Sequence, residues 1–155
     1  MPDTITLAEL KALEGKPFGT SDWYEITQEK IDKFADVTED WQFIHCDPEA
    51  AKETPFGTTI AHGFLTLSML SAMVYEMPVL KNVAMGVNYG FDKIRFLSPV
   101  PAGARIRAHF TMTHVDDSHP GFVTTRMETT IEIEGQDKPA LIADWIGRRY
   151  FGEET

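Results

Sequence analysis

Two histidines and an aspartate gather within one short part of the sequence. The stretch from Glu39 to Leu70 reads EDWQFIHCDPEAAKETPFGTTIAHGFLTLSML, with Asp40 five positions before His45 and His62 next to Gly63. A carboxylate can act as a base, and an imidazole can act as acid or base near neutral pH. We therefore interpret Asp40 and His45 as a candidate proton-transfer pair. A turn-capping aspartate and a structural histidine would have the same spacing, so spacing alone leaves both interpretations open.

Gly63 stands at the start of an apolar segment that we expect to be a helix. The first N–H groups of a helix have no partner within it and lie at the positive end of its dipole. Glycine has no side chain to block an approaching group, so the Gly63 N–H is a candidate oxyanion site. Close packing of the helix against a sheet explains the glycine equally well. His62 is either catalytic or a brace for the start of the helix.

Other site chemistries are less well supported. His45, Asp47 and His62 could be imagined as metal ligands, but no H-x-x-x-H or C-x-x-C spacing accompanies them, so we expect no metal. Cys46 is the only cysteine, and nothing in the sequence pairs it with an orienting carboxylate, so we expect it to fill space. The remaining histidines are expected to be solvated or structural: His109, His114 and His119.

Composition limits the classes of protein to consider. The chain has 155 residues and 43% hydrophobic residues, which predicts a single domain over residues 1–155. Its formal net charge of −10 argues against a nucleic-acid partner. No secretory signal pattern or membrane-spanning apolar run is visible, and a single cysteine suits a reducing compartment. We expect a cytoplasmic protein that does not bind membranes.

The first half of the chain reads mainly as helix. Apolar spacing and capping residues predict helices over 7–13 and 27–37 and a short helix starting at Pro48, with an irregular loop over 39–46. The segment 61–77 leaves no wide polar face, so we expect one long helix that is buried nearly all round. Pro78 should end it.

The second half reads as strands. We expect strands over 82–97, with a break near Gly90, and over 103–115, 121–135 and 140–151. One face of the third should carry Val123, Thr125, Met127, Thr129, Ile131 and Ile133. The order of elements predicts an α+β fold in which an antiparallel sheet wraps one central helix.

The sequence resembles a known family. The runs DWQFIHCDPEAA, PFGTTIAHGFLTL and NYGFDKIRFLSPVPAGARIRA are similar to those of the MaoC-like hydratases, or (R)-specific enoyl-CoA hydratases, and most similar to the nodulation-protein-N-like branch. The resemblance covers about residues 22–107. It implies the hot-dog fold, in which an antiparallel β-sheet wraps a long central α-helix, and a homodimer with the two sheets side by side.

The resemblance also implies an activity. Members of the family add water to trans-2-enoyl-CoA in fatty acid metabolism and give the (3R)-3-hydroxyacyl-CoA, with CoA as part of the substrate and no separate cofactor. The family motif D-x-N-P-x-H falls on Asp40 and His45 as catalytic residues, and the Gly63 N–H would hold the thioester oxygen. Gln42-Phe43 replaces the family's Asn-Pro, a departure that bears on substrate range rather than on the reaction.

Several other residues are candidates for contact with an acyl-CoA substrate. Candidates for the pocket are Gln42, His62, Asn88 and Tyr89, although a tyrosine packed within the sheet is an equal alternative for the last. Candidates for the CoA phosphates are Lys93, Arg95, Arg105, Arg107, Arg148 and Arg149. Two alternatives to hydration stay open on the sequence: a hot-dog acyl-CoA thioesterase and a non-catalytic acyl-CoA-binding protein.

Overall fold

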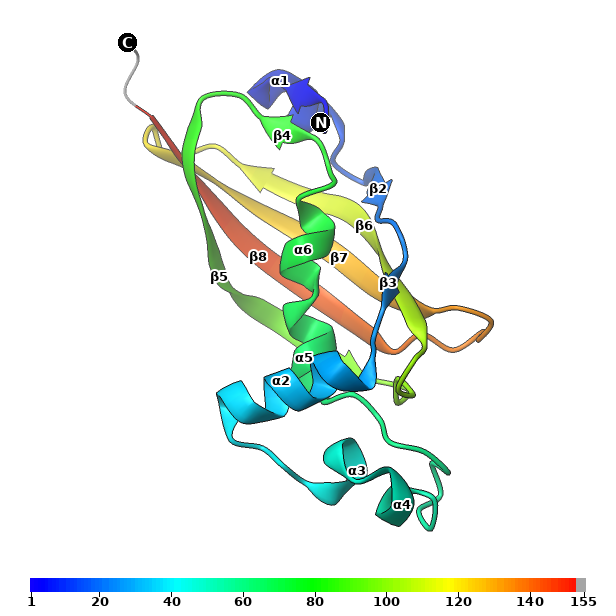
Figure 1. Ribbon diagram of the computed structural model, residues 1–155. Helices are drawn as coiled ribbons and strands as arrows, with labels where there is room; N and C mark the ends of the chain where they lie inside the picture. The colour runs from blue at the N-terminus through cyan, green and yellow to red at the C-terminus, as the bar shows by residue number, and fades with distance from the viewer. Residues whose placement is uncertain (153–155) are drawn as a thin grey trace.

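A strongly curved antiparallel sheet forms the body of the molecule in the computed structural model, which describes residues 1–152 (Figure 1). The last three residues of the expected domain, 153–155, lie outside the described residues. The sheet runs in the order β2-β6-β7-β8-β5, and β3 also pairs with β6. Its strands are β2 (Lys16–Thr20), β3 (Tyr24–Glu25), β5 (Val83–Phe96), β6 (Arg105–Asp116), β7 (Phe122–Ile133) and β8 (Leu141–Phe151). The four long strands expected from the sequence are confirmed.

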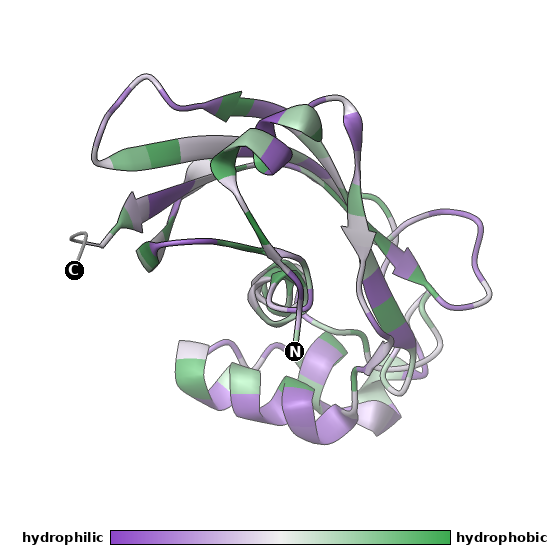
Figure 2. Cartoon of the chain, turned by 90° about the horizontal axis from the view of Figure 1, so that it is seen from above, coloured by the Kyte–Doolittle hydropathy of each residue, from purple (hydrophilic) through white to green (hydrophobic). Residues whose placement is uncertain are grey.

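Two consecutive helical segments lie within the curve of the sheet. They are α5 (Gly63–Ser68) and α6 (Leu70–Val74), and Figure 2 shows them nearly end-on beneath the sheet. Hydrogen bonds from Met69 N to Leu65 O (3.0 Å) and from Met73 N to Met69 O (3.1 Å) run through the junction. The segments therefore continue one another as a single rod. The expected inner face of β7 is confirmed, because every second residue from Val123 to Ile133 is buried.

The rod is not buried nearly all round, so that expectation is wrong. Phe64 is 69% exposed and Tyr75 is 78% exposed, and Ser68 and Ser71 are exposed as well. These four positions recur at helical spacing and form one stripe. The sheet covers the opposite side of the rod, and the described residues leave the stripe uncovered.

Short elements close the ends of the sheet. At one end α1 (Leu7–Ala12) is capped by Thr6, and β1 (Thr4–Ile5) pairs in parallel with β4 (Val79–Leu80). At the other end α2 (Gln28–Thr38) lies across the start of α5 (Figure 1). Thr27 begins α2 by accepting the Lys30 N–H at 3.2 Å. The predicted helices over 7–13 and 27–37 are thus confirmed.

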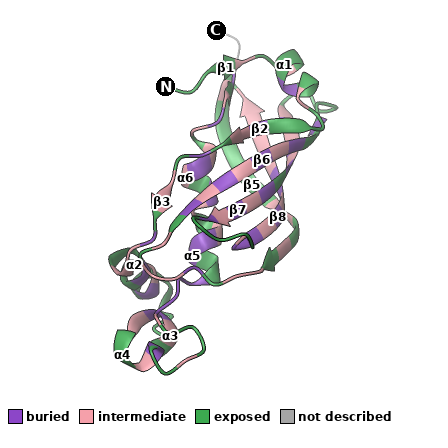
Figure 3. Cartoon of the chain, turned by 90° about the vertical axis from the view of Figure 1, so that its right-hand side faces the viewer, coloured by how far each residue is buried: buried purple, intermediate pink, exposed green. Residues whose placement is uncertain are grey.

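Two short helices lie below the sheet in Figure 3. One is α4 (Pro48–Ala51), capped by Asp47 as expected. The other is α3 (Phe43–Cys46), within a segment predicted to be an irregular loop; that prediction is wrong. The turn is closed by bonds from His45 N to Gln42 O and from Asp47 N to Phe43 O, both 2.9 Å.

Strand β5 forms one edge of the sheet. The pairing register with β8 shifts between Asn88 and Gly90, which confirms the expected break. Met85, Val87 and Tyr89 are 54%, 43% and 59% exposed, so this edge presents apolar side chains together with unpaired backbone groups. None of the helices in residues 1–152 is long and apolar enough to cross a membrane.

The Thr27 cap can be tested by substitution. Thr27→Ala removes the acceptor for the Lys30 N–H and should lower the free energy of unfolding by about 1 kcal/mol. Thr27→Ser keeps the hydroxyl and should stay close to the parent protein. Denaturant titration measures both variants, and equal stability of the alanine and serine variants would show that the cap does not stabilise α2.

Candidate active site

A cavity of about 270 Å³ opens at the start of α5. It lies between the helix start, the segment after α4 and the end of β5. Its walls include His45, Phe56, Ile60, Gly63, Phe96 and Val100. Three elements far apart in the chain therefore meet at one hollow, and two of the residues singled out in the sequence, His45 and Gly63, line it.

His45 is held as a neutral imidazole with one free nitrogen. Its side chain is buried, and Nδ1 lies 2.7 Å from the carbonyl oxygen of Ile60. A carbonyl only accepts, so Nδ1 donates its proton and Nε2 keeps a lone pair. Burial lowers the pKa of His45 below its ordinary value of 6.5, because low polarity disfavours the charged ring. His45 is therefore set up to accept a proton at Nε2.

His62 packs directly against His45. The two rings are stacked with centroids 3.9 Å apart and planes 24° apart, and Phe34 of α2 covers His62 with a centroid distance of 4.9 Å. His62 Nε2 donates to the backbone carbonyl of Asp40 at 2.9 Å. Its Nδ1 is buried and has no hydrogen-bond partner within residues 1–152. The contacts make His62 a positioning residue that fixes both the His45 ring and the backbone at Asp40.

Asp40 places its carboxylate at the rim of the cluster. The preceding residue, Glu39, ends α2 in the left-handed conformation with φ 59°, and this turns the chain toward the histidines. The Asp40 side chain is 53% exposed, and its Oδ1 accepts the Gln42 N–H at 3.3 Å. Asp40 offers one carboxylate oxygen, and His45 and His62 each offer one ring nitrogen. These three atoms all lie within 4.8 Å of one another. A water molecule with hydrogen bonds of about 2.8 Å can bridge that span.

Gly63 is in close contact with an aromatic ring. A Cβ at position 63 would lie 3.0 Å from two ring carbons of Phe96, which is tighter than nine in ten real Cβ contacts. Glycine therefore lets the start of α5 and the end of β5 enclose the cavity together. The Gly63 N–H belongs to the first turn of the rod, whose amide protons have no helical acceptor.

A carboxylate and two imidazoles within 4.8 Å are also within reach of one metal ion. One ring nitrogen of each histidine already donates to a backbone carbonyl, His45 Nδ1 to that of Ile60 and His62 Nε2 to that of Asp40, which leaves one nitrogen of each ring for a ligand. Burial, followed by the charge of Asp32, raises the pKa of the neighbouring Cys46 thiol, so the thiolate needed for nucleophilic attack is disfavoured.

The sequence matches a known protein family. A family model described as "MaoC like domain" matches residues 9–135. The chain belongs to the MaoC-like domain family. The 3-hydroxyacyl-thioester dehydratase Z of Mycobacterium tuberculosis is 48% identical over 92% of this chain and 95% of its own length. Nodulation protein N of Rhizobium leguminosarum bv. viciae is 48% identical over 92% and 89%.

Solved structures confirm the hot-dog fold. The (R)-hydratase from A. caviae, described as involved in PHA biosynthesis, covers 85% of this chain and 95% of its own, with a TM-score of 0.71 at 22% identity. The MaoC-like dehydratase from Rhodospirillum rubrum covers 97% and 99%, with a TM-score of 0.76 at 18% identity. The sheet curled about a central helix is thus the MaoC-like architecture.

The structure brings only some of the sequence candidates of this MaoC-like chain together. His45 and Gly63 line the cavity, and Asp40 and His62 cluster with His45 beside it. Gln42 contacts the cluster through its backbone, because its backbone carbonyl accepts a hydrogen bond from the backbone N–H of His45. Asn88 lines a second cavity. Tyr89 stacks under Arg148, whose Cζ lies 4.0 Å from the ring centroid, and neither Asn88 nor Tyr89 is among the residues that line the cavity at His45.

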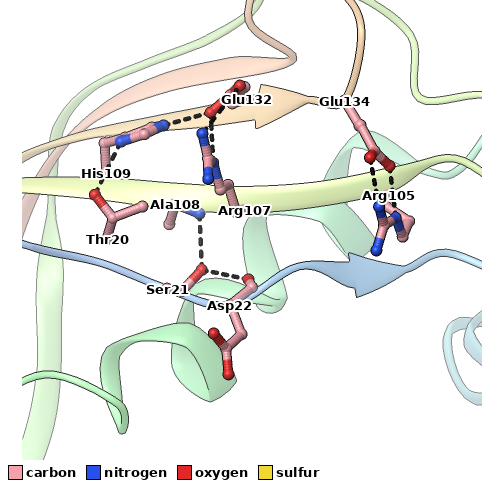
Figure 4. A network of polar contacts seen from close by, with 9 residues as sticks. All are labelled: Thr20, Ser21, Asp22, Arg105, Arg107, Ala108, His109, Glu132 and Glu134. Atoms are coloured by element: carbon pink, nitrogen blue, oxygen red, sulfur yellow. Dashed lines mark hydrogen bonds and ion pairs between the residues drawn. The ribbon is translucent and has the colours of Figure 1, made fainter.

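The cationic side chains considered for the CoA phosphates differ in their partners. Arg105 pairs with Glu134, and Arg107 pairs with Glu132, on the face of the sheet that points away from the helix rod (Figure 4). His109 bonds the same Glu132 at 2.6 Å, so it is structural, as expected. The described residues give Lys93 and Arg95 no carboxylate partner.

Some lining residues were not anticipated. Thr66 lies one helical turn after Gly63 and lines the cavity, and its i, i+3 spacing was the available signal. Phe96 and Phe34 come from β5 and α2, and no sequence pattern connects them to the histidines.

The state of His45 can be measured directly. In a ring-nitrogen NMR titration, His45 should show the Nδ1–H tautomer and a pKa below 6.5. Because the folded state disfavours its protonation, the stability that depends on neutral His45 should be present above pH 6.5 and decline as pH falls through the lowered pKa. The exposed His114 serves as the reference ring. A His45 pKa above 6.5 would contradict this account of the site.

Proposed function

We propose that the protein hydrates trans-2-enoyl-CoA to (3R)-3-hydroxyacyl-CoA and catalyses the reverse dehydration. The observation that carries the proposal is that His45 and Gly63 line one cavity while one atom each of Asp40, His45 and His62 lie within 4.8 Å of one another. A hydro-lyase is also the enzyme class that membership of the MaoC-like family supports. A relative at 48% identity is named a dehydratase of 3-hydroxyacyl thioesters, which is the same reaction in the opposite direction.

The chemistry divides into charge stabilisation and proton transfer. The thioester carbonyl accepts a hydrogen bond from the Gly63 N–H, which stabilises the negative charge that develops on its oxygen as C3 is attacked. One such donor can lower the barrier by roughly 3 kcal/mol. Asp40 and His45 Nε2 hold the attacking water between them.

Atoms balance in one addition of water. As the oxygen of the water bonds to C3, one of its protons passes to the Asp40–His45 pair, and the pair returns one proton to C2 of the enolate. Both groups would hold the same water, so the proton is assigned to the pair rather than to one residue. His62 holds the His45 ring and the Asp40 backbone in place throughout.

The surroundings suit an acyl thioester. Apolar walls from Ile60, Phe96 and Val100 take the carbon chain next to C3. We assign the CoA phosphates to Lys93 and Arg95, because both lie at the end of β5 beside Phe96 and neither has a carboxylate partner within residues 1–152. Gln42 stands at the rim beside Asp40, where it can contact the substrate.

We also propose that the chain forms a homodimer through β5 and works in the cytoplasm. Met85 and Val87 lie at the exposed apolar edge, and Phe64 and Tyr75 lie on the uncovered stripe of the rod. Val87 and Tyr75 line one cavity, and Figure 1 shows β5 beside α6. Antiparallel pairing of β5 with a second copy would join the two sheets side by side and cover that stripe. A single cysteine suits a reducing compartment.

The catalytic pair is tested by conservative substitutions. Asp40→Asn and His45→Gln each remove a proton acceptor and should lower kcat by about 10² to 10⁴-fold. The loss of the conjugated enoyl absorbance of crotonyl-CoA measures the rate, and circular dichroism confirms folding. His114→Gln, at an exposed position, is the matched control. A folded Asp40 or His45 variant with near-parental kcat would overturn the assignment, and release of free CoA thiol would indicate a thioesterase.

The dimer is tested at the strand edge. The double variant Met85→Lys, Val87→Lys puts like charges where two copies of β5 would meet, so it should sediment as a monomer. Val37→Lys, at a site 83% exposed on α2, should leave the assembly unchanged. A dimer that persists in the double variant would place the interface elsewhere.

A further inference from the structure

A second cavity of about 250 Å³ lies under the far end of the helix rod. It is bounded by α6, by the first half of β5 and by the end of β8, and it shares no lining residue with the cavity at His45. Much of its wall is apolar, from Val74, Met77, Val83 and Met127. It exceeds the roughly 150 Å³ of an apolar cavity known to hold benzene, so it can hold a short carbon chain.

Two arginines line this cavity, Arg148 and Arg149, and neither forms an ion pair with a carboxylate of residues 1–152. Arg149 lies on the helix-facing side of β8, opposite Val123 of β7 and Gly86 of β5. Its Nη1 donates to Thr125 Oγ1 at 2.7 Å, and no acidic side chain within residues 1–152 forms an ion pair with it. Burial lowers the pKa of Arg149, and no neighbouring charge opposes that shift. A shielded guanidinium without a counter-charge is costly.

The other arginines of β6, β7 and β8 have other partners. Arg105, Arg107 and Arg126 each pair with a carboxylate. Arg148 also lines the cavity; its Cζ lies 4.0 and 4.7 Å from the ring centroids of Tyr89 and Phe122, and its Nε is buried without a hydrogen-bond partner in residues 1–152. Arg149 has neither a carboxylate nor an aromatic ring against it among the described residues.

Trp145 also lines this cavity. Trp145 is 5% exposed, and its indole N–H is buried with no hydrogen-bond partner within the described residues. The cavity wall includes no aspartate or glutamate. A guanidinium without a counter-charge, in a cavity whose wall holds no acidic side chain, calls for an acceptor that carries negative charge.

We infer that this second cavity binds a carboxylate on a short apolar chain, with the carboxylate on Arg149. A planar carboxylate fits the guanidinium fork in two parallel hydrogen bonds, and the apolar walls take the carbon chain. The carboxylate comes either from a free short-chain acid or from the far end of a substrate's acyl chain.

The second of these sources, the far end of a substrate's acyl chain, depends on the proposed function and on the proposed dimer. If β5 pairs antiparallel with its copy, the Val83–Asn88 half of one strand lies beside the Phe96 end of the other. The second cavity of one protomer then lies next to the catalytic cavity of its partner. An acyl chain that starts at His45 of one copy would end near the partner's Arg149.

The test is a binding measurement that requires no turnover. By calorimetry or NMR titration, hexanoate should bind the parent protein about tenfold or more tightly than hexan-1-ol, because a charge-assisted pair is lost in the alcohol. Arg149→Met should remove this preference, and Arg149→Lys should keep part of it. Arg126→Met, on the other face of the sheet, should leave it unchanged. Equal binding of acid and alcohol, or an undiminished preference in Arg149→Met, would overturn the proposal.

Two further readouts separate a ligand role from a structural one. Without ligand, Arg149→Met should have an unchanged or higher Tm, because it removes a shielded charge; a lower Tm would identify Arg149 as a structural residue and overturn the proposal. Hexanoate that raises KM for an enoyl-CoA at constant kcat would identify the acyl chain as the source. Hexanoate could also bind without changing KM for the enoyl-CoA, or bind to a protein that proves inactive as a hydratase. Either result would identify a free short-chain acid as the source of the carboxylate.

Discussion

The face-to-face contact of two buried imidazole rings is the constraint on which the site depends. At 3.9 Å between centroids, His45 and His62 cannot both carry a positive charge in surroundings that exclude water. Burial lowers the pKa of His45, and each ring donates one N–H to a backbone carbonyl, that of Ile60 or that of Asp40. The stack thereby ties together three segments: the end of α2, the helical turn α3 and the start of the central rod.

Other elements of the fold cover the two stacked rings and complete the site around them. Helix α2 covers His62 with Phe34 and anchors itself by burying Ile31 and Ala35 completely. The sheet supplies apolar walls and a close-packed Phe96, and the rod supplies an amide at Gly63. The result combines neutral bases with an unpaired donor beside an apolar hollow. A conjugated thioester needs that combination, because its reacting atoms become charged while its chain stays apolar.

Much of the fold could be predicted, because period-two alternation in residues 123–133 and the Thr27 and Asp47 caps act locally. The turn α3 was missed because four residues carry too little periodicity to separate a helix from a loop. The exposed stripe at Phe64 and Tyr75 was missed because apolar composition predicts burial without saying what covers the surface. The proximity of His45 and His62 was not predictable from periodicity, since their contact depends on two backbone carbonyls. Asn88 and Tyr89 are consecutive on a strand, so their side chains point to opposite faces.

The most direct test of the account is the product formed from crotonyl-CoA in D₂O, analysed by mass spectrometry and chiral chromatography. Addition of water by the Asp40–His45 pair predicts (3R)-3-hydroxybutyryl-CoA with one deuterium at C2, because the proton returned to that carbon comes from solvent. Free CoA thiol without a hydroxylated product, or crotonyl-CoA recovered unchanged, would contradict it.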